Sequence, residues 1–210
     1  MRIARGSDEF SRVLTFSDGM FAIAMTLLVV GIGIPELKDQ SSVRELWDDF
    51  GRLYQEILSF FISFAVIGRY WVAHHRFFAR VEAMNYRLVW QNLIYLGFIA
   101  FLPFPTALLG NYFENPLAVS SYAVSVAIIS GLEVVLFRRA HDDGLLAGEM
   151  PTDVYRWGTI TSTLPVLFFF ASVPIAFVST GLAVATWFLS IPVQLLWLNR
   201  RMPRNAEDWF

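Results

Sequence analysis

The chain has 210 residues, of which 56% are hydrophobic and only 16% are charged. An ordinary soluble domain carries about 25% charged residues, so this composition excludes such a domain and indicates a polytopic membrane protein. The formal net charge of −2 gives no indication of a nucleic-acid partner, and the absence of cysteine excludes disulfides and thiolate metal sites. Because there are also only three histidines, we expect neither a bound metal nor a cofactor.

Six apolar segments follow one another, and each is close to the ~20 residues that a helix needs to cross a bilayer. They cover approximately residues 13–34, 53–73, 88–110, 117–137, 159–178 and 182–198. The last two meet at Ser179-Thr180-Gly181, which is compatible with a tight hairpin or with one kinked helix. A single helix of about forty residues is too long for one crossing, so we favour the hairpin. Residues 1–210 are therefore predicted to form one all-α domain with six transmembrane helices.

Basic residues lie mostly at one set of segment ends. Lys38, Arg44 and Arg52 flank one set, whereas the remaining 13 of the 16 Lys and Arg residues (16 − 3) flank the other. Cytoplasmic loops are enriched in Lys and Arg, so both termini are predicted to be cytoplasmic. We therefore predict a multi-pass protein of the cell (inner) membrane. The first loop is then external, and its pattern predicts a short amphipathic helix from Ser42.

An apolar stripe runs along one side of the first segment when it is drawn as an ideal helix with about 100° per residue. The stripe consists of Gly19, Ile23, Thr26, Leu27, Val30 and Ile34. Copies of this helix around an axis would stack rings of Ile23, Leu27 and Val30, and apolar rings gate a pore by dewetting. Thr26 is the only hydroxyl beside the stripe and is a candidate for ion selectivity. The alternative is an ordinary packing face, which buries against neighbouring helices.

Polar residues near the first three segments are candidates for a second site, because ionisable groups at membrane depth are costly unless paired. Arg12 and Asp18 lie about 120° apart on one helix, so each needs a partner on another helix. Trp71 and His75 are four residues apart and share a face, although His74 remains an alternative to His75. The predicted polar network consists of Arg12, Ser17, Asp18, Trp71, His75 and Asn92.

Prolines and acidic residues interrupt the later apolar segments. Pro103 and Pro105 predict a kink or an end in the third segment, where Thr106 can cover the freed carbonyl groups. Glu56 and Glu133 fall in or near apolar segments. A proton-relay role of Glu133 stays open, as does snorkelling of its carboxylate to the membrane edge.

The motif Arg12-x-x-x-Phe16-Ser17-Asp18, followed by GMFAIAMTLLV, resembles the first transmembrane helix of the endosomal and lysosomal potassium channel family, transmembrane protein 175. The resemblance is closer to the bacterial members, which carry one six-helix repeat per chain. Further matches are WVAHHRFF from Trp71 to Phe78, the Asn92-Leu93 pair, and FLPFPTALL from Phe101 to Leu109. These matches span the first three segments, whereas the rest of the chain is similar only in hydropathy.

The resemblance implies a homotetramer in which the first helix lines a potassium pore. It also implies that Ile23, Leu27 and Val30 form the constriction and that the polar network packs behind the pore helix. Gly31 departs from the family, because many members carry an acidic residue there. An acidic attraction for cations at the outer mouth then depends on Glu36 or on a neighbouring loop carboxylate, Asp39.

We therefore expect a passive, potassium-permeable cation channel and no enzyme activity. The alternative is a proton-coupled secondary transporter or a proton-permeable channel that uses Asp18, His75 and Glu133 as a relay. No TVGYG-like filter, His-Glu-x-x-His or Gly-x-Ser-x-Gly motif occurs in the sequence. A membrane enzyme based on His74 and His75 is less favoured, because adjacent side chains on a helix point about 100° apart.

Overall fold

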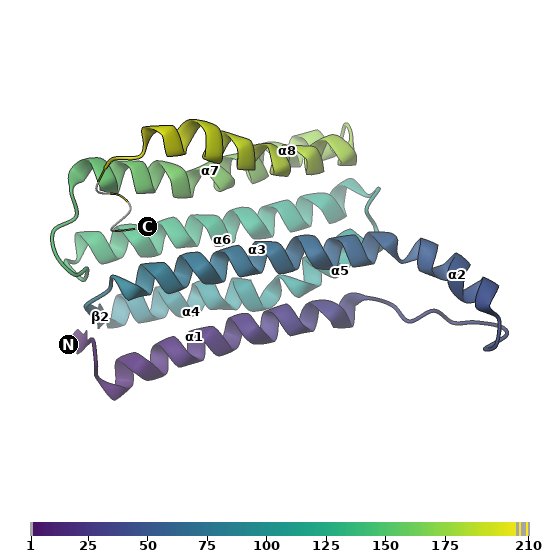
Figure 1. The fold of residues 1–210 in the computed structure, drawn as a ribbon, viewed down its shortest axis with the longest axis horizontal. Helices are drawn as coiled ribbons and strands as arrows, with labels where there is room; N and C mark the ends of the chain where they lie inside the picture. The colour runs from purple at the N-terminus through teal and green to yellow at the C-terminus, as the bar shows by residue number, and fades with distance from the viewer. Residues whose placement is uncertain (1, 205, 207–208, 210) are drawn as a thin grey trace.

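The computed structural model describes residues 2–204, 206 and 209, and these residues form a bundle of long helices (Figure 1). The helices are α1 (Asp8–Leu27), α2 (Val43–Arg52), α3 (Tyr54–Ala79), α4 (Tyr86–Phe101), α5 (Pro103–Asn111), α6 (Pro116–Asp142), α7 (Thr152–Ala176) and α8 (Thr180–Pro192). A 3₁₀ turn at Leu28–Gly31 continues α1, and a π-helical turn at Val193–Leu198 continues α8. The predicted helical architecture is confirmed.

All six predicted apolar segments fall in helices, but they differ in length. Within the described residues, five helical stretches are long and apolar enough to cross a membrane. They are Asp8–Gly31, Tyr54–Ala79, Tyr86–Asn111, Pro116–Asp142 and Thr152–Ala176. The sixth, α8, has only 13 residues in regular helix before its π-helical turn. The chain is therefore a multi-pass membrane protein.

The core of the bundle is centred on α6, and α1 lies at its edge (Figure 1). In the most apolar part of α6, 61% of the residues are buried, whereas the corresponding part of α1 is only 22% buried. Two polar contacts tie α6 to α3: the Ser63 hydroxyl lies 3.2 Å from the Tyr122 hydroxyl, and the Tyr70 hydroxyl contacts that of Ser130. Helix α1 is thus held by one side only, and most of its surface is free of intrachain packing.

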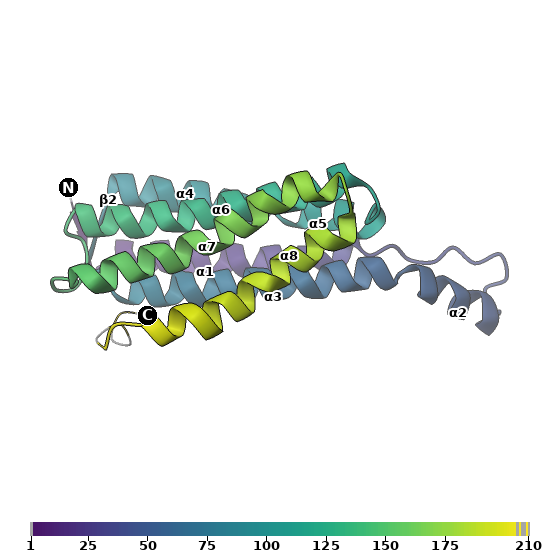
Figure 2. The same ribbon diagram turned by 90° about the horizontal axis from the view of Figure 1, so that it is seen from above.

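The predicted hairpin between the last two segments is confirmed. Helix α7 ends at Ala176, and Ser179 caps α8 by accepting a hydrogen bond from the backbone N–H of Leu182 at 3.4 Å. Helix α8 then returns alongside α7 toward the end of the bundle where both chain ends lie (Figures 1 and 2). The Trp187 indole of α8 donates to the Ser172 hydroxyl of α7 at 2.8 Å, which satisfies both polar groups inside the hairpin.

The two prolines of the third segment divide it as expected. Helix α4 ends at Phe101 and α5 begins at Pro103, because a proline ring has no N–H to continue the hydrogen-bond ladder. The Thr106 hydroxyl lies 2.9 Å from the carbonyl oxygen of Leu102 and 2.8 Å from the Ser63 hydroxyl. The Leu102 carbonyl also accepts the backbone N–H of Thr106 at 3.1 Å, so it is not a carbonyl freed by the prolines, and the predicted covering of a freed carbonyl is wrong. The Thr106 hydroxyl instead joins α5 to α3 through Ser63.

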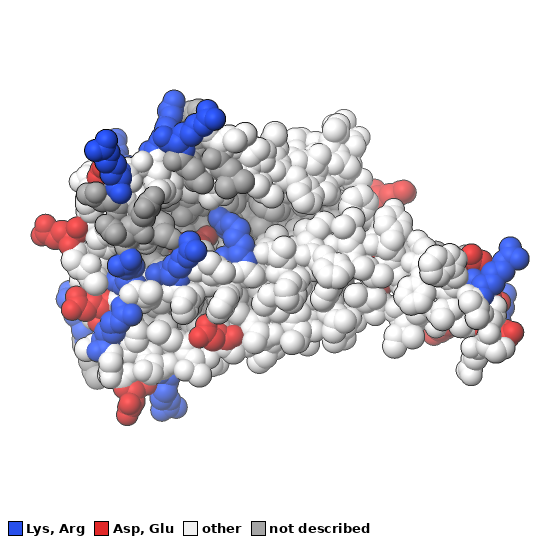
Figure 3. All heavy atoms as spheres, viewed as in Figure 1, with Lys and Arg blue, Asp and Glu red and all other residues white. Residues whose placement is uncertain are grey.

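The predicted amphipathic helix of the first loop is α2, which projects beyond the bundle (Figure 1). Ser42 caps it by accepting from the backbone N–H of Glu45 at 3.2 Å. Figure 3 shows charged side chains at α2 and at the opposite end of the molecule, with a broad uncharged band between them on this face. Such a band matches the hydrocarbon layer of a bilayer.

A short ribbon at the end opposite α2 was not predicted. Strand β1 (Arg2–Ala4) pairs antiparallel with β2 (Ala83–Asn85), and Ile3 lies opposite Met84. The Arg5 guanidinium donates to the carbonyl oxygens of Ala79 and Val81. The N-terminus is thereby fixed to the connection between α3 and α4, and α1 begins at Asp8, five residues before the predicted start.

Candidate functional site

Helix α1 is attached to its own chain along one face. The buried residues of this face, including the first residue of the 3₁₀ turn, are Phe10, Ser17, Phe21, Ala24 and Leu28. The Phe21 ring packs edge-on against the His74 imidazole of α3, with ring centroids 5.3 Å apart, and lies 6.1 Å from the Tyr95 ring of α4. This face therefore sets the rotation of α1 about its own axis.

The predicted stripe lies on the other face of α1 and is uncovered within the chain. The side chains of Ile23, Leu27 and Val30 are 54%, 45% and 76% exposed. Thr26 is also exposed, and its hydroxyl donates to the carbonyl oxygen of Ile23 at 2.8 Å. An apolar face of this kind is compatible with contact to lipid or to further protein chains. Within this chain, therefore, the stripe does not pack against neighbouring helices.

The C-terminal end of α1 is tightened into a 3₁₀ turn and lies close to α5. The 3₁₀ turn Leu28–Gly31 advances by about 120° per residue, so Val30 lies on the same side as Leu27, three residues before it, and stays part of the exposed stripe. A Cβ atom at Gly31 would lie 3.2 Å from the Cβ of Ala107. There is thus no room for a larger side chain pointing toward α5. The exposed residues Glu36 and Asp39 remain candidates for an acidic outer mouth.

A continuous chain of hydrogen bonds joins α1, α3 and α4 in the interior. The His74 Nε2 donates to Asn92 Oδ1 at 2.9 Å, and Asn92 Nδ2 donates to the Ser17 hydroxyl at 3.0 Å. Ser17 in turn donates to the carbonyl oxygen of Val13 at 2.9 Å. The three side chains are buried, so each polar group depends on this chain for its partners.

The prediction that His75 belongs to this network is wrong, because His74 is the histidine that reaches Asn92. The spacing of four residues correctly predicted that His75 and Trp71 share a face of α3, and their ring centroids lie 5.7 Å apart. That face, however, is exposed. The buried face of α3 carries Ser59, Ser63, Ile67, Tyr70, His74 and Phe78.

The predicted network is therefore divided into two parts. Asp18 accepts a hydrogen bond from the Trp71 indole at 3.0 Å, and both side chains are exposed, so this contact is separate from the buried chain. Arg12 is exposed and makes no hydrogen bond or ion pair with any residue that the structure describes. Asp18 and Trp71 fasten the side of α1 that adjoins α3.

Glu56 has a positioning role that the sequence did not reveal. Its carboxylate accepts a hydrogen bond from the backbone N–H of Gly33 at 2.6 Å, which fixes the segment after α1 to the start of α3. The backbone of Glu56 also packs against Gly110 of α5, where a Cβ atom would lie only 2.9 Å from the Cα of Glu56. The apolar sequence around Glu56 contains no motif that indicates this contact.

We expect Gly110→Ala to lower the free energy of unfolding by about 1–3 kcal/mol, because the added methyl group forces apart the backbones of α3 and α5. Gly97→Ala is the matched control, since nothing lies within 4 Å of a Cβ atom at Gly97 of α4. Thermal unfolding of both purified variants in the same detergent measures the difference. Equal melting temperatures for the two variants would show that α3 and α5 are not in this close contact.

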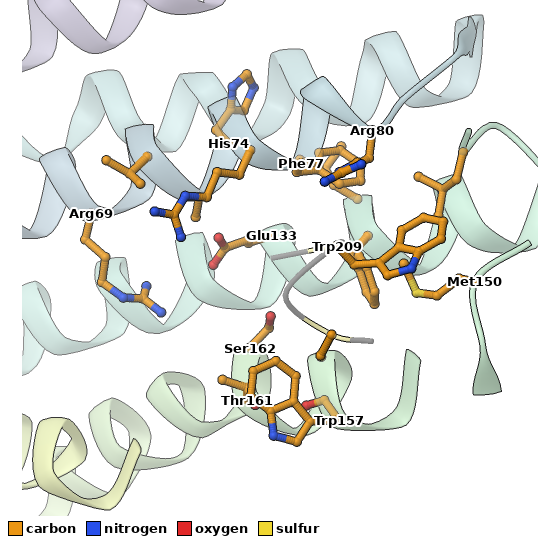
Figure 4. Close-up of a pocket in the computed structure, with 18 of the residues that line it drawn as sticks. Arg69, His74, Phe77, Arg80, Glu133, Met150, Trp157, Thr161, Ser162 and Trp209 are labelled. Atoms are coloured by element: carbon orange, nitrogen blue, oxygen red, sulfur yellow. Dashed lines mark hydrogen bonds between the residues drawn. The ribbon is translucent and has the colours of Figure 1, made fainter. Parts of the chain in front are cut away.

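Glu133 does not join the residues proposed with it as a proton relay. It lies on α6 and lines a cavity between α3, α6 and α7 (Figure 4). Asp18, in contrast, is bound to the Trp71 indole. The Glu133 carboxylate makes no hydrogen bond to Asp18 or His75. Among the described residues, no three His, Cys, Asp or Glu side chains lie close enough together to hold a metal ion.

Comparison with known proteins finds similarity to one family of potassium channels. A family model described as endosomal/lysosomal potassium channel TMEM175 matches residues 12–103. A potassium channel of Chamaesiphon minutus is 35% identical over 86% of this chain and 91% of its own. A potassium channel of Streptomyces collinus is 32% identical over 85% of this chain and 87% of its own.

The similarity extends to three-dimensional structure. The crystal structure of a lysosomal potassium-selective channel TMEM175 homolog from Chamaesiphon minutus superposes with a TM-score of 0.77. Its sequence is 30% identical, and the superposition covers 90% of this chain and 98% of that structure. At this coverage the structural similarity extends well beyond residues 12–103, which match the family model.

Proposed function

Because this chain belongs to the TMEM175 family, we propose that it is a potassium channel in which four copies place α1 around a common pore. The observation that carries this proposal is the division of α1 into two faces. One face is fastened to α3 and α4, and the other presents Ile23, Thr26 and Leu27 away from the chain. Symmetric assembly then covers the outward face without changing the fold of the subunit.

In the proposed pore, Ile23 and Leu27 from four subunits form stacked apolar rings. Hydrated cations cannot exchange their water for methyl groups, so a narrow ring of this kind blocks conduction until it widens. Val30 forms a wider outer ring at the 3₁₀ turn. These rings act as both gate and constriction.

Thr26 is the proposed polar contact for a passing ion. Its hydroxyl proton is donated to the carbonyl oxygen of Ile23, so the lone pairs of the hydroxyl oxygen stay available to a cation. Four such oxygens replace part of the hydration shell of a potassium ion. Conduction is passive, with both termini and the arginine-rich end on the cytoplasmic side and with α8 as the sixth crossing.

The proton-coupled alternative lacks a comparable arrangement. A relay needs a continuous series of proton-exchanging groups, whereas Asp18 binds the Trp71 indole and neither Asp18 nor His75 lines the cavity that Glu133 lines. The buried chain from His74 to Ser17 ends at a backbone carbonyl oxygen, which does not pass a proton onward. These contacts favour a structural role for the hydrogen bonds that link His74, Asn92 and Ser17.

Planar-bilayer recording of the purified protein tests the proposed function. With potassium on one side, sodium on the other and the same pH on both, we expect currents that reverse at a potential set by potassium. Imposing a pH gradient should leave this reversal potential unchanged. Currents that require a pH gradient, or that follow it, would contradict a potassium channel and support the proton-coupled alternative.

A further inference from the structure

Helix α2 has an apolar face that is exposed along its whole length. Spacings of three and four residues put four apolar side chains on one side of the helix. They are Val43, Leu46, Trp47 and Phe50. All four are exposed, and Val43 and Trp47 are 82% and 76% exposed. Glu45 and Asp48 lie on the opposite side of the helix. A cluster of exposed apolar side chains bordered by charged ones indicates a partner surface.

The contacts that fix α2 to its connecting loop lie on its polar side. The Glu45 carboxylate accepts hydrogen bonds from the backbone N–H groups of Lys38 and Asp39, each at 3.2 Å. Glu45 points away from Trp47 on the helix, so these contacts leave the apolar face uncovered. The loop and the first turn of α2 therefore have their own supports, and the apolar face stays available to a partner.

The apolar face of α2 leads directly into an exposed apolar surface of α3. Leu53 joins the two helices in a right-handed helical conformation, with φ −76° and ψ −4°, so no loop separates them. Tyr54, Leu58 and Phe61 continue the helical spacing of Phe50, and all three are exposed. Helix α3 is long and apolar enough to cross a membrane. The apolar face of α2 is therefore the continuation of a surface that lies in the bilayer.

The length of α3 places α2 at the boundary of the bilayer. The 26 residues of α3 extend over about 39 Å, whereas the hydrocarbon layer is ~30 Å thick. The end of α3 at Tyr54 thus reaches the lipid headgroups, where α2 begins. Figure 3 agrees with this placement, because the charged side chains at α2 follow directly on the uncharged band. Trp and Tyr side chains are enriched at this depth, which suits Trp47 and Tyr54.

We propose that α2 lies on the surface of the bilayer at the end opposite the termini, with Trp47 and Phe50 inserted between the lipid headgroups. Glu45 and Asp48 then face water on the other side of the helix. An amphipathic helix of this kind binds through the apolar area that it buries. The partner is thus the lipid surface, which holds the segment between α1 and α3 against the membrane. This contact does not depend on which ion passes along α1.

Spin labelling of the full-length protein in vesicles of palmitoyloleoylphosphatidylcholine tests the proposal. The chain has no cysteine, so Val43→Cys gives a single labelling site on the apolar face and leaves Trp47 and Phe50 in place. Asp48→Cys is the matched control on the polar side of the same helix. The measured quantity is the collision rate of the nitroxide with oxygen, divided by its collision rate with the water-soluble complex nickel ethylenediaminediacetate.

We expect this ratio to be about tenfold higher at position 43 than at position 48, because oxygen concentrates in lipid and the nickel complex stays in water. Equal ratios, with both labels open to the nickel complex, would place α2 in water and overturn the proposal. A label at position 43 that is shielded from both reagents and broadened by neighbouring labels would mean that a second copy of the chain covers this face, which would also overturn it.

Two double variants of the labelled Val43→Cys protein show whether the apolar side chains hold α2 in place. Trp47→Gln with Phe50→Gln should lower the ratio at position 43 about tenfold, because little apolar area remains to bury. Arg44→Gln with Asp48→Asn changes two side chains outside the apolar face and should leave the ratio unchanged. An unchanged ratio in the first variant, or equal losses in both, would overturn the assignment of the anchor to Trp47 and Phe50.

Discussion

Replacing Ile23 by asparagine is expected to raise the basal potassium conductance about tenfold or more. A polar side chain keeps water in the narrowest ring, which removes the dewetting barrier that the apolar side chain provides. Leu27→Asn should act in the same way, and Val30→Asn less strongly, because Val30 lies in the 3₁₀ turn beyond the regular helix. The selectivity of these variants for potassium should also decrease, because the same rings form the gate and the constriction. Thr26→Ala should instead change selectivity with a smaller effect on leak.

Single-channel recording of correctly assembled protein measures these effects. Ile160→Asn on α7 is the matched control, because Ile160 is 56% exposed and Ile23 is 54% exposed in the isolated chain, while α7 lies on the far side of the bundle from α1 (Figure 1). The control should conduct like the wild type. If Ile23→Asn and Leu27→Asn also conduct like the wild type, ions do not pass along this face.

Asn92→Leu is expected to lower the free energy of unfolding by roughly 2–4 kcal/mol. The amide of Asn92 serves both His74 and Ser17, and leucine leaves the imidazole N–H without an acceptor and the Ser17 hydroxyl without a donor. Both are buried, so water does not replace the lost contacts. Because these hydrogen bonds join α1 to α3 and α4, the variant should also yield less assembled protein.

Thermal unfolding in detergent, with size-exclusion chromatography, measures both effects. Asn111→Leu is the control, since Asn111 is exposed and its side chain donates only to the carbonyl oxygen of Ala107 in its own helix. A melting temperature of Asn92→Leu equal to that of the control would mean that the buried hydrogen bonds of Asn92 do not hold α1 in place.

The parts of the fold that the sequence predicted are those with a strong local cause. The length of the apolar segments predicted the long helices, and Pro103 and Pro105 predicted the break between α4 and α5. Ser42 predicted the start of α2. Ribbon β1–β2 was missed because strands of three residues have no periodicity to detect. Its pairing depends on a contact between segments about eighty residues apart.

The candidate site was predictable on its outward face and less so on its inward one. A stripe at helical spacing is a property of one segment, so Ile23, Thr26 and Leu27 were found together. The choice between His74 and His75 depends on how α3 is rotated against α1 and α4, which the spacing from Trp71 does not determine. Glu56 was missed as a clamp because its partner is a backbone N–H, which every residue except proline possesses.

Thiol modification during recording tests most directly whether ions pass along the outward face of α1. The chain has no cysteine, so Leu27→Cys introduces a single reactive site. We predict that a cationic methanethiosulfonate reagent blocks the current of Leu27→Cys irreversibly, because it adds bulk and positive charge to the constriction. The wild type and Ile160→Cys should keep their full currents. A conducting Leu27→Cys channel whose current survives this treatment, although its cysteine is modified, would contradict a pore lined by α1.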